Sequence, residues 1–184
     1  MVSRFLLLFC IAFPAFGAEV AGVTLADTDQ QLVLNGAGLR KRAFFHVYVI
    51  GLYLPEKKAL AAEAIGAAGP KRIAIHMVRD VGADQFSDAL LDGMKDNHSD
   101  TDMKALEPRA KQLAAIMAEM KEAKKGMRIV LDWLPAAGTQ VTVEGKPAGA
   151  PIQGEDFYRA LLRIWLGEKP VQDDLKKALL GEKQ

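Results

Sequence analysis

The chain has 184 residues, of which 50% are hydrophobic and 26% charged, and its formal net charge is +1. This composition is that of one ordinary globular domain large enough to bury most of its apolar surface, so a second domain is not expected. The near balance of 24 basic and 23 acidic residues gives the chain as a whole no attraction for nucleic acid or for an anionic membrane.

The first 18 residues are predicted to be a cleaved secretory signal. Arg4 supplies the positive n-region, residues 5–13 the apolar segment, and residues 15–18 the small side chains of a cleavage site, with cleavage after Gly17 or Ala18. A membrane anchor is the alternative, but the apolar run is too short for a hydrocarbon core that needs about 20 residues. The mature domain is therefore expected to span residues 19–184.

The only cysteine, Cys10, lies inside this leader. The mature domain would then be free of cysteine, so it must be stabilised by its core and cannot use thiol catalysis. Export without disulfides fits a bacterial periplasm best. Oligomeric state leaves no clear signature in the sequence.

Alternating and helical patterns succeed one another along the mature chain. Turn-forming residues at Asp27-Thr28-Asp29 and Gly36-Ala37-Gly38 are predicted to separate the first strands, and a turn is predicted over residues 144–147. The predicted strands are 20–25, 31–34, 43–54, 72–78, 127–134 and 140–143. The predicted helices with clear bounds are 59–68, 156–166 and 173–180. Another helix begins at Ala83 and carries Phe86, Leu90, Gly93 and Asn97 on one side. The helix after it is capped by Thr101-Asp102 and ended by residues 124–126.

Strands and helices in this order predict an α+β fold, with a mostly antiparallel sheet covered on one face by helices. A doubly wound parallel sheet would need strands and helices in regular alternation, which the sequence lacks.

Residues 32–55 combine cations with an apolar, strand-forming run. On the strand from Ala43 to Leu54, strict alternation places the even-numbered residues on one face, among them Phe44, His46 and Tyr48. Arg42 joins that face if the strand extends backward without a bulge, and Arg40 would follow. A guanidinium beside a phenol forms a clamp for a carboxylate or an enolate. The alternative is that the arginines occupy a solvated turn and Tyr48 is a core aromatic residue.

Motifs for other chemistries are absent from the sequence. It contains no HExxH, no CxxC, no nucleophile elbow GxSxG, no phosphate-binding loop and no GxGxxG after a strand. No metal ion and no cofactor are therefore expected. His76 and His98 are interpreted as structural or solvated residues.

Three segments resemble the chalcone isomerase superfamily, in particular its bacterial secreted branch. They are NGAGLR at residues 35–40, YVIGLYL at 48–54 and FYRALLRIWLG at 157–167. The resemblance covers nearly all of the mature chain. It implies an open-faced β-sandwich, in which a large antiparallel sheet packs against a layer of helices.

In the plant isomerases of this superfamily, an arginine after the Gly-Ala-Gly segment stabilises the negative charge that develops during cyclisation. Arg40 matches that arginine, although a shorter loop leaves Arg42 as the alternative. The catalytic threonine falls at Tyr48, the helix tyrosine at Phe86 and the helix asparagine at Gly93. The polar position of the penultimate helix falls at Tyr158.

Another branch of the superfamily binds fatty acids without catalysis, and holds the carboxylate with the same arginine and a tyrosine at the strand position. Arg40 and Tyr48 reproduce that pair. Leu90, Met94 and Leu161 are candidate walls for the acyl chain, although each is equally well explained as a core residue. The resulting hypothesis is a periplasmic, non-catalytic protein that binds a small apolar anion such as a fatty acid. Its expected ligand-binding residues are Arg40, Tyr48, Arg42, Phe86 and Tyr158.

Two alternatives remain open from the sequence. The first is an isomerase, an intramolecular lyase acting on a chalcone-like or other unsaturated phenolic compound through Arg40, with His46 or Tyr48 transferring the proton. The second is a structural or interaction module whose pocket is vestigial and filled by its own side chains, Phe86 and Tyr158 among them.

Overall fold

The computed structural model describes residues 17–182. Its strands are β1 (Ala18–Val20), β2 (Val23–Leu25), β3 (Thr28–Asp29), β4 (Leu32–Arg42), β5 (Phe45–Leu54), β6 (Lys71–Met77), β7 (Val81–Gly82), β8 (Glu122–Ala123), β9 (Arg128–Leu134), β10 (Gly138–Val143) and β11 (Lys146–Ile152). Its helices are α1 (Ala61–Gly66), α2 (Ala83–Lys95), α3 (Asp100–Ala118), α4 (Glu155–Leu166) and α5 (Asp173–Leu179). The predicted leader and Cys10 lie outside the described residues, except for Gly17 and for Ala18, which begins β1.

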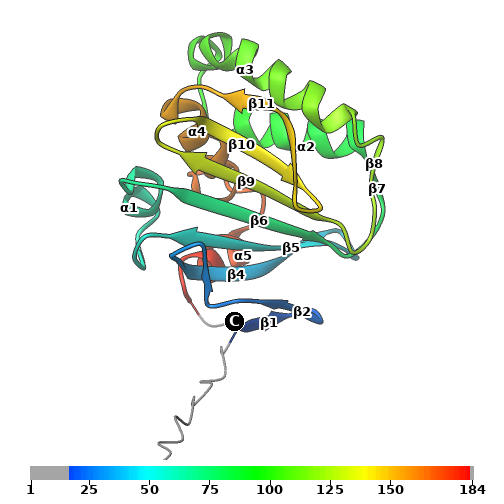
Figure 1. Ribbon diagram of the computed structural model, residues 1–184, viewed down its shortest axis with the longest axis vertical. Helices are drawn as coiled ribbons and strands as arrows, with labels where there is room; N and C mark the ends of the chain where they lie inside the picture. The colour runs from blue at the N-terminus through cyan, green and yellow to red at the C-terminus, as the bar shows by residue number, and fades with distance from the viewer. Residues whose placement is uncertain (1–16, 183–184) are drawn as a thin grey trace, which may run out of the picture.

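A seven-stranded antiparallel sheet organises the domain, in the order β11-β10-β9-β6-β5-β4-β3. Figure 1 shows α2, α4 and α5 behind this sheet, α3 above its upper edge and α1 at its left end, with the short β1–β2 hairpin beside its lower edge. The predicted α+β class and the open-faced sheet covered by helices are confirmed. Within residues 17–182 no helix is both long enough and apolar enough to cross a bilayer.

The sheet buries apolar side chains on both faces. The main core lies on the helix side, where Tyr48, Ile50, Leu52 and Leu54 of β5 meet residues of the helices. A smaller cluster on the other face contains Val49 and Tyr53 of β5, residues of β4 and Leu25 of β2. From Tyr48 onward, β5 thus follows the predicted alternation.

Gly36-Ala37-Gly38 does not form the predicted turn; it lies in the middle of β4, paired with residues 50–52 of β5. The glycines are needed because α5 packs directly on this strand. A Cβ on Gly36 would lie 2.7 Å from the Leu179 carbonyl carbon, and one on Gly38 would lie 2.6 Å from Leu175 Cδ1. The motif therefore gives a backbone surface on which a helix can rest.

A β-bulge interrupts the alternation at the start of β5. Arg40 pairs with Tyr48, but Lys41 pairs with His46, so Val47 is the extra residue. The bulge reverses which residues face the helices, and Phe45 and Val47 join Tyr48 on that side. The predicted placement of Phe44 and His46 on this face is wrong. The bulge turns His46 away from the helices, and Phe44 lies in the two-residue turn between β4 and β5.

Three further local predictions are corrected, two in α3 and one in the turn after β10. Ser99, not Thr101, caps α3: its Oγ accepts from Asp102 N at 3.1 Å in a capping box, and α3 ends at Ala118. The turn after β10 is confined to Glu144-Gly145, both with positive φ, so Lys146-Pro147 already belongs to β11.

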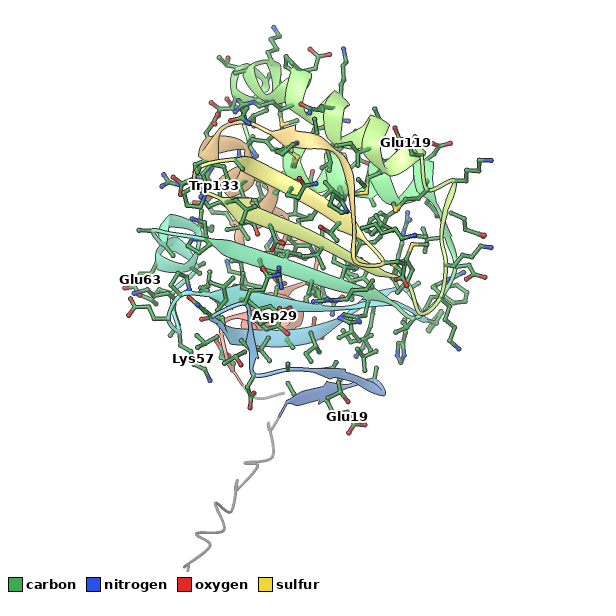
Figure 2. All side chains as sticks on the ribbon, viewed as in Figure 1. Glu19, Asp29, Lys57, Glu63, Glu119 and Trp133 are labelled. Atoms are coloured by element: carbon green, nitrogen blue, oxygen red, sulfur yellow. The ribbon has the colours of Figure 1, made fainter. Side chains whose placement is uncertain are left out.

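A network of ion pairs binds β3 to the open face of the sheet, where Figure 2 labels Asp29. Arg72 of β6 lies between Asp132, at 2.6 Å, and Asp29, at 2.5 Å, and Arg128 also reaches Asp29 at 2.7 Å. Burial opposes ionisation of Asp29, but hydrogen bonds and charges from the two arginines outweigh it and lower its pKa.

We expect Asp29→Asn to destabilise the protein at neutral pH by about 2 kcal/mol, since hydrogen bonds to charged groups contribute that much. A lowered pKa stabilises the folded state above the unfolded pKa of about 3.9, and this contribution is lost as the pH falls through the folded pKa. The difference from wild type should therefore narrow below about pH 4. Urea unfolding at several pH values measures it, with Asp88→Asn on exposed α2 surface as the control; a difference independent of pH would contradict the assignment.

Candidate functional site

A cavity of about 400 Å³ opens between the start of β5, the end of β4 and helices α2 and α4. Its polar lining comes from Arg40, Arg42, Tyr48, Arg79 and Gln85. The remaining lining is apolar and consists of Ala43, Phe45, Val47, Val81, Phe86, Ala89, Leu90, Ile164 and Val171. The combination suits a ligand with one anionic end and a hydrocarbon body.

Arg40 and Tyr48 are direct cross-strand partners in the β4–β5 ladder. Partners of this kind have Cβ atoms roughly 5 Å apart, so both side chains can contact one small group. The half-buried Arg40 lies on the same side as Gly36 and Gly38, at the point where α5 begins. Arg40 thus points inward and lines the cavity, while Arg42 lines its more exposed part.

Gln172, the residue before α5, holds the end of β4 in position. Its Oε1 accepts from Lys41 N at 2.7 Å and from Arg40 Nη1 at 3.3 Å, and its Nε2 donates to Leu39 O at 3.0 Å. Arg40 Nη1 also donates to Lys41 O. These contacts hold the guanidinium in place before a ligand binds. The entropic cost of ordering this side chain on binding is therefore smaller.

The Tyr48 hydroxyl is fixed by Trp165 of α4, whose Nε1 donates to it at 3.0 Å. Because the oxygen accepts this bond, the phenol keeps its own O–H to donate elsewhere. The Phe86 ring lies edge-on to Tyr48, with centroids 6.2 Å apart. Tyr48 is thereby oriented as a donor.

Burial raises the pKa of Tyr48 above its usual value, although the bond from Trp165 and the charge of Arg40 oppose the shift. The phenol therefore stays protonated at neutral pH. A protonated phenol donates a hydrogen bond to an anion and cannot act as a base.

No carboxylate forms an ion pair with Arg40, Arg42 or Arg79 in the part of the chain that the structure describes. Arg79 instead stacks on Phe45, with its Cζ 4.5 Å from the ring centroid. These three guanidinium groups give the lining of the cavity a local positive charge, although the whole chain is nearly neutral.

The structure brings Arg40, Arg42, Tyr48 and Phe86 together around the cavity, but it places Tyr158 elsewhere. Tyr158 is buried beneath β9, donates from its hydroxyl to Leu131 O at 2.9 Å, and packs against Trp133. Its expected place in the lining is therefore corrected: on α4 it is Ile164, six positions later, that faces the cavity. Of the three predicted wall residues, Leu90 lines the cavity, whereas Met94 and Leu161 belong to the surrounding core.

Sequence reasoning missed Phe45, Val47, Arg79, Trp165 and Gln172. Phe45 and Val47 were missed because the bulge changes the alternation of β5. Arg79 was missed because it lies in the loop after β6, which only the pairing of the strands brings close to the cavity. The FYRALLRIWLG segment carried a signal for Trp165, since a buried indole N–H usually finds an acceptor. Among residues 17–182 no group of three or more histidine, cysteine or acidic residues is placed to hold a metal ion.

Comparison with known families agrees with this architecture. The family model described as chalcone isomerase-like matches residues 17–181, which is nearly all of the described chain. The chain belongs to the chalcone isomerase-like family. No curated protein sequence matches it.

A crystal structure of a fatty-acid binding protein from Arabidopsis thaliana is similar to this domain, with a TM-score of 0.65 and 18% sequence identity. The similarity covers 86% of this chain and 92% of that protein. At this identity, the likeness establishes a shared chalcone isomerase fold.

Proposed function

We propose that this chalcone isomerase-like protein binds a small apolar anion, such as a fatty acid, in the cavity and does not transform it. The observation that carries the proposal is the Arg40–Tyr48 pair in the lining of a cavity whose other lining residues are mostly apolar. The ligand carboxylate would accept hydrogen bonds from Arg40 and from the Tyr48 hydroxyl, with Arg42 adding positive charge. The acyl chain would lie against Phe86, Leu90 and Ile164.

The fatty-acid binding protein that shares the fold gives this proposal further support. We also propose that the protein acts in the bacterial periplasm, on the basis of the leader predicted over residues 1–18. A volume of about 400 Å³ is near the lower end of the range for ligand pockets, which favours short and medium acyl chains.

Isomerase chemistry has less support than binding. His46 is one of the two candidate proton-transfer groups. It lies on the face of β5 that points away from the cavity, and it lines a different surface groove. Tyr48, the second, is held protonated, so it could act as an acid but not as the base. Neither a histidine nor a carboxylate is among the residues that line the cavity in the described chain.

The positions of the missing catalytic groups are also filled by hydrocarbon. Phe86 packs on Tyr48, and a Cβ on Gly93 would lie 2.8 Å from Ile164 Cγ2, so no polar side chain fits there without a shift. The vestigial-pocket alternative is disfavoured because open space remains beside Arg40 with every lining side chain in place.

Calorimetric titration of delipidated protein with saturated acids from octanoate to octadecanoate tests the proposal. Each buried methylene adds up to about 0.8 kcal/mol, so affinity should rise about fourfold per carbon until the chain outgrows the cavity. Decanol, which lacks the charge, should bind much more weakly than decanoate. Absence of binding throughout the series, or equal binding of decanol, would refute the proposal.

Tyr48→Phe should weaken decanoate binding by about tenfold, since a hydrogen bond to a charged group contributes at least about 1.5 kcal/mol. It should also destabilise the fold by about 1 kcal/mol because the Trp165 N–H loses its acceptor. Calorimetry and urea unfolding measure the two effects, with Tyr53→Phe on the opposite sheet face as the control. Unchanged affinity in Tyr48→Phe would remove the phenol from the site.

A further inference from the structure

The turn between β4 and β5 presents aromatic side chains to solvent. Phe44 is 98% exposed and Phe45 58%, although two phenylalanines in sequence are usually buried. The turn contains only Ala43 and Phe44, and Ala43 has a φ of 51°, so the hairpin is tight. We refer to residues 41–45 as the hairpin tip.

Cations surround the hairpin tip. Lys41 and Arg42 belong to it, and Arg79 stacks on Phe45. Val78 N donates to Val47 O at 3.1 Å, which fixes the loop carrying Arg79 beside the start of β5.

The turn containing Lys124 and Lys125 lies next to this loop, because Gly126 N donates to Met77 O at 2.8 Å. None of the five cations forms an ion pair with a carboxylate within residues 17–182. Asp80 lies among them and accepts from Lys125 N at 2.7 Å, and Asp84 and Glu122 lie in the adjoining β7–α2 and β8 segments. The surface is therefore basic on balance, which the near-neutral net charge conceals.

Exposed aromatic side chains with cations around them are complementary to a membrane surface whose lipids carry negative charge. Aromatic side chains partition into the interface between headgroups and acyl chains, and each nearby Lys or Arg is attracted to anionic headgroups. We propose that the hairpin tip docks on an anionic phospholipid bilayer, with Phe44 inserted and Lys41, Arg42, Arg79, Lys124 and Lys125 against the headgroup phosphates.

The tip also adjoins the cavity, since Arg42, Ala43 and Phe45 line its mouth. Docking through the tip would turn this mouth toward the membrane, where an apolar anion could pass between bilayer and cavity. This transfer of a ligand between bilayer and cavity rests on the proposed binding function, but the docking itself does not depend on it.

Co-sedimentation with vesicles tests the docking surface. We expect wild type to bind phosphatidylcholine vesicles containing about one-third phosphatidylglycerol, and not vesicles of phosphatidylcholine alone, with binding weakened by salt. Phe44→Ser should lower the partition coefficient about tenfold. Leu60→Ser, which changes another exposed apolar residue, 61% exposed and remote from the tip, should leave it unchanged.

The charged part of the surface has its own matched pair. Lys41→Glu should weaken vesicle binding at least about fivefold. Lys57→Glu, which makes the same change in net charge at the opposite end of the sheet, as Figure 2 shows, should have little effect. Equal effects of the two variants would show that vesicle binding depends only on the net charge of the protein, and would overturn the proposed surface.

Calorimetry with decanoate on the same variants separates docking from binding. Phe44 does not line the cavity, so Phe44→Ser should bind decanoate like wild type. Vesicle binding without decanoate binding would refute the proposed function and leave the docking surface intact. Failure of wild type to bind anionic vesicles, or dimerisation through Phe44 seen by sedimentation velocity in its place, would overturn the docking proposal.

Discussion

Arg40→Ala is expected to lower the affinity for decanoate by about ten- to a hundredfold, because a hydrogen bond to a charged group contributes about 1.5–3 kcal/mol. The weak binding of decanol should not change, since decanol presents no charge to the guanidinium. The fold should be little affected, because Arg40 is only half-buried and makes no ion pair within residues 17–182. Calorimetry with the two ligands measures the difference.

Arg163→Ala is the matched control for this variant. Arg163 is an exposed arginine of α4 that lies outside the cavity, so its removal alters the net charge equally without altering the site. Arg42→Ala distinguishes the two candidate arginines and should cost less than Arg40→Ala, because Arg42 is exposed and has no tyrosine opposite it. A larger loss of decanoate affinity in Arg42→Ala than in Arg40→Ala would show that Arg42 is the residue that binds the carboxylate.

Gly36→Ala is expected to destabilise the protein by about 1–3 kcal/mol, the usual cost of forcing extra volume into a packed contact. The added methyl would meet the backbone of Ala178 and Leu179, and backbone atoms cannot move aside as a flexible side chain can. Displacement of α5 would also move Gln172, so decanoate affinity should fall in parallel. Urea unfolding and calorimetry measure both effects.

Gly66→Ala provides the comparison for the same chemical change. No atom lies within 4 Å of a Cβ at Gly66, which ends α1, so alanine should be neutral there or stabilise the helix by up to about 1 kcal/mol. Equal stabilities of the two variants would contradict the close packing of α5 on β4.

The order of helices and strands could be predicted from the sequence because each segment repeats its apolar residues with its own period. Residues 83–95 carry a helical stripe, and β5 alternates from Tyr48 to Leu54 as predicted. Predictions failed where one residue changes the register. The bulge at Val47 exchanges His46 for Phe45 on the helix face, and alternation alone does not reveal a bulge.

The candidate site was predictable in part for a related reason. Arg40 and Tyr48 lie on two adjoining strands, so a short stretch of sequence contains both. Arg79, Trp165 and Gln172 reach the same place from distant segments, and only the sheet order and the docking of α4 and α5 bring them together. The sequence of Gly36-Ala37-Gly38 predicts a turn because glycines permit one, whereas in the structure these glycines are needed for the close packing of α5.

Native mass spectrometry of the purified protein tests the central claim most directly. We expect wild type to retain a bound carboxylic acid that is released on denaturation, and Arg40→Ala, purified in the same way, to have lost most of it. Arg163→Ala should retain it. Wild type without any bound acid after exposure to a mixture of fatty acids, or Arg40→Ala with the same occupancy as wild type, would contradict the assignment of this cavity as a site for an apolar anion.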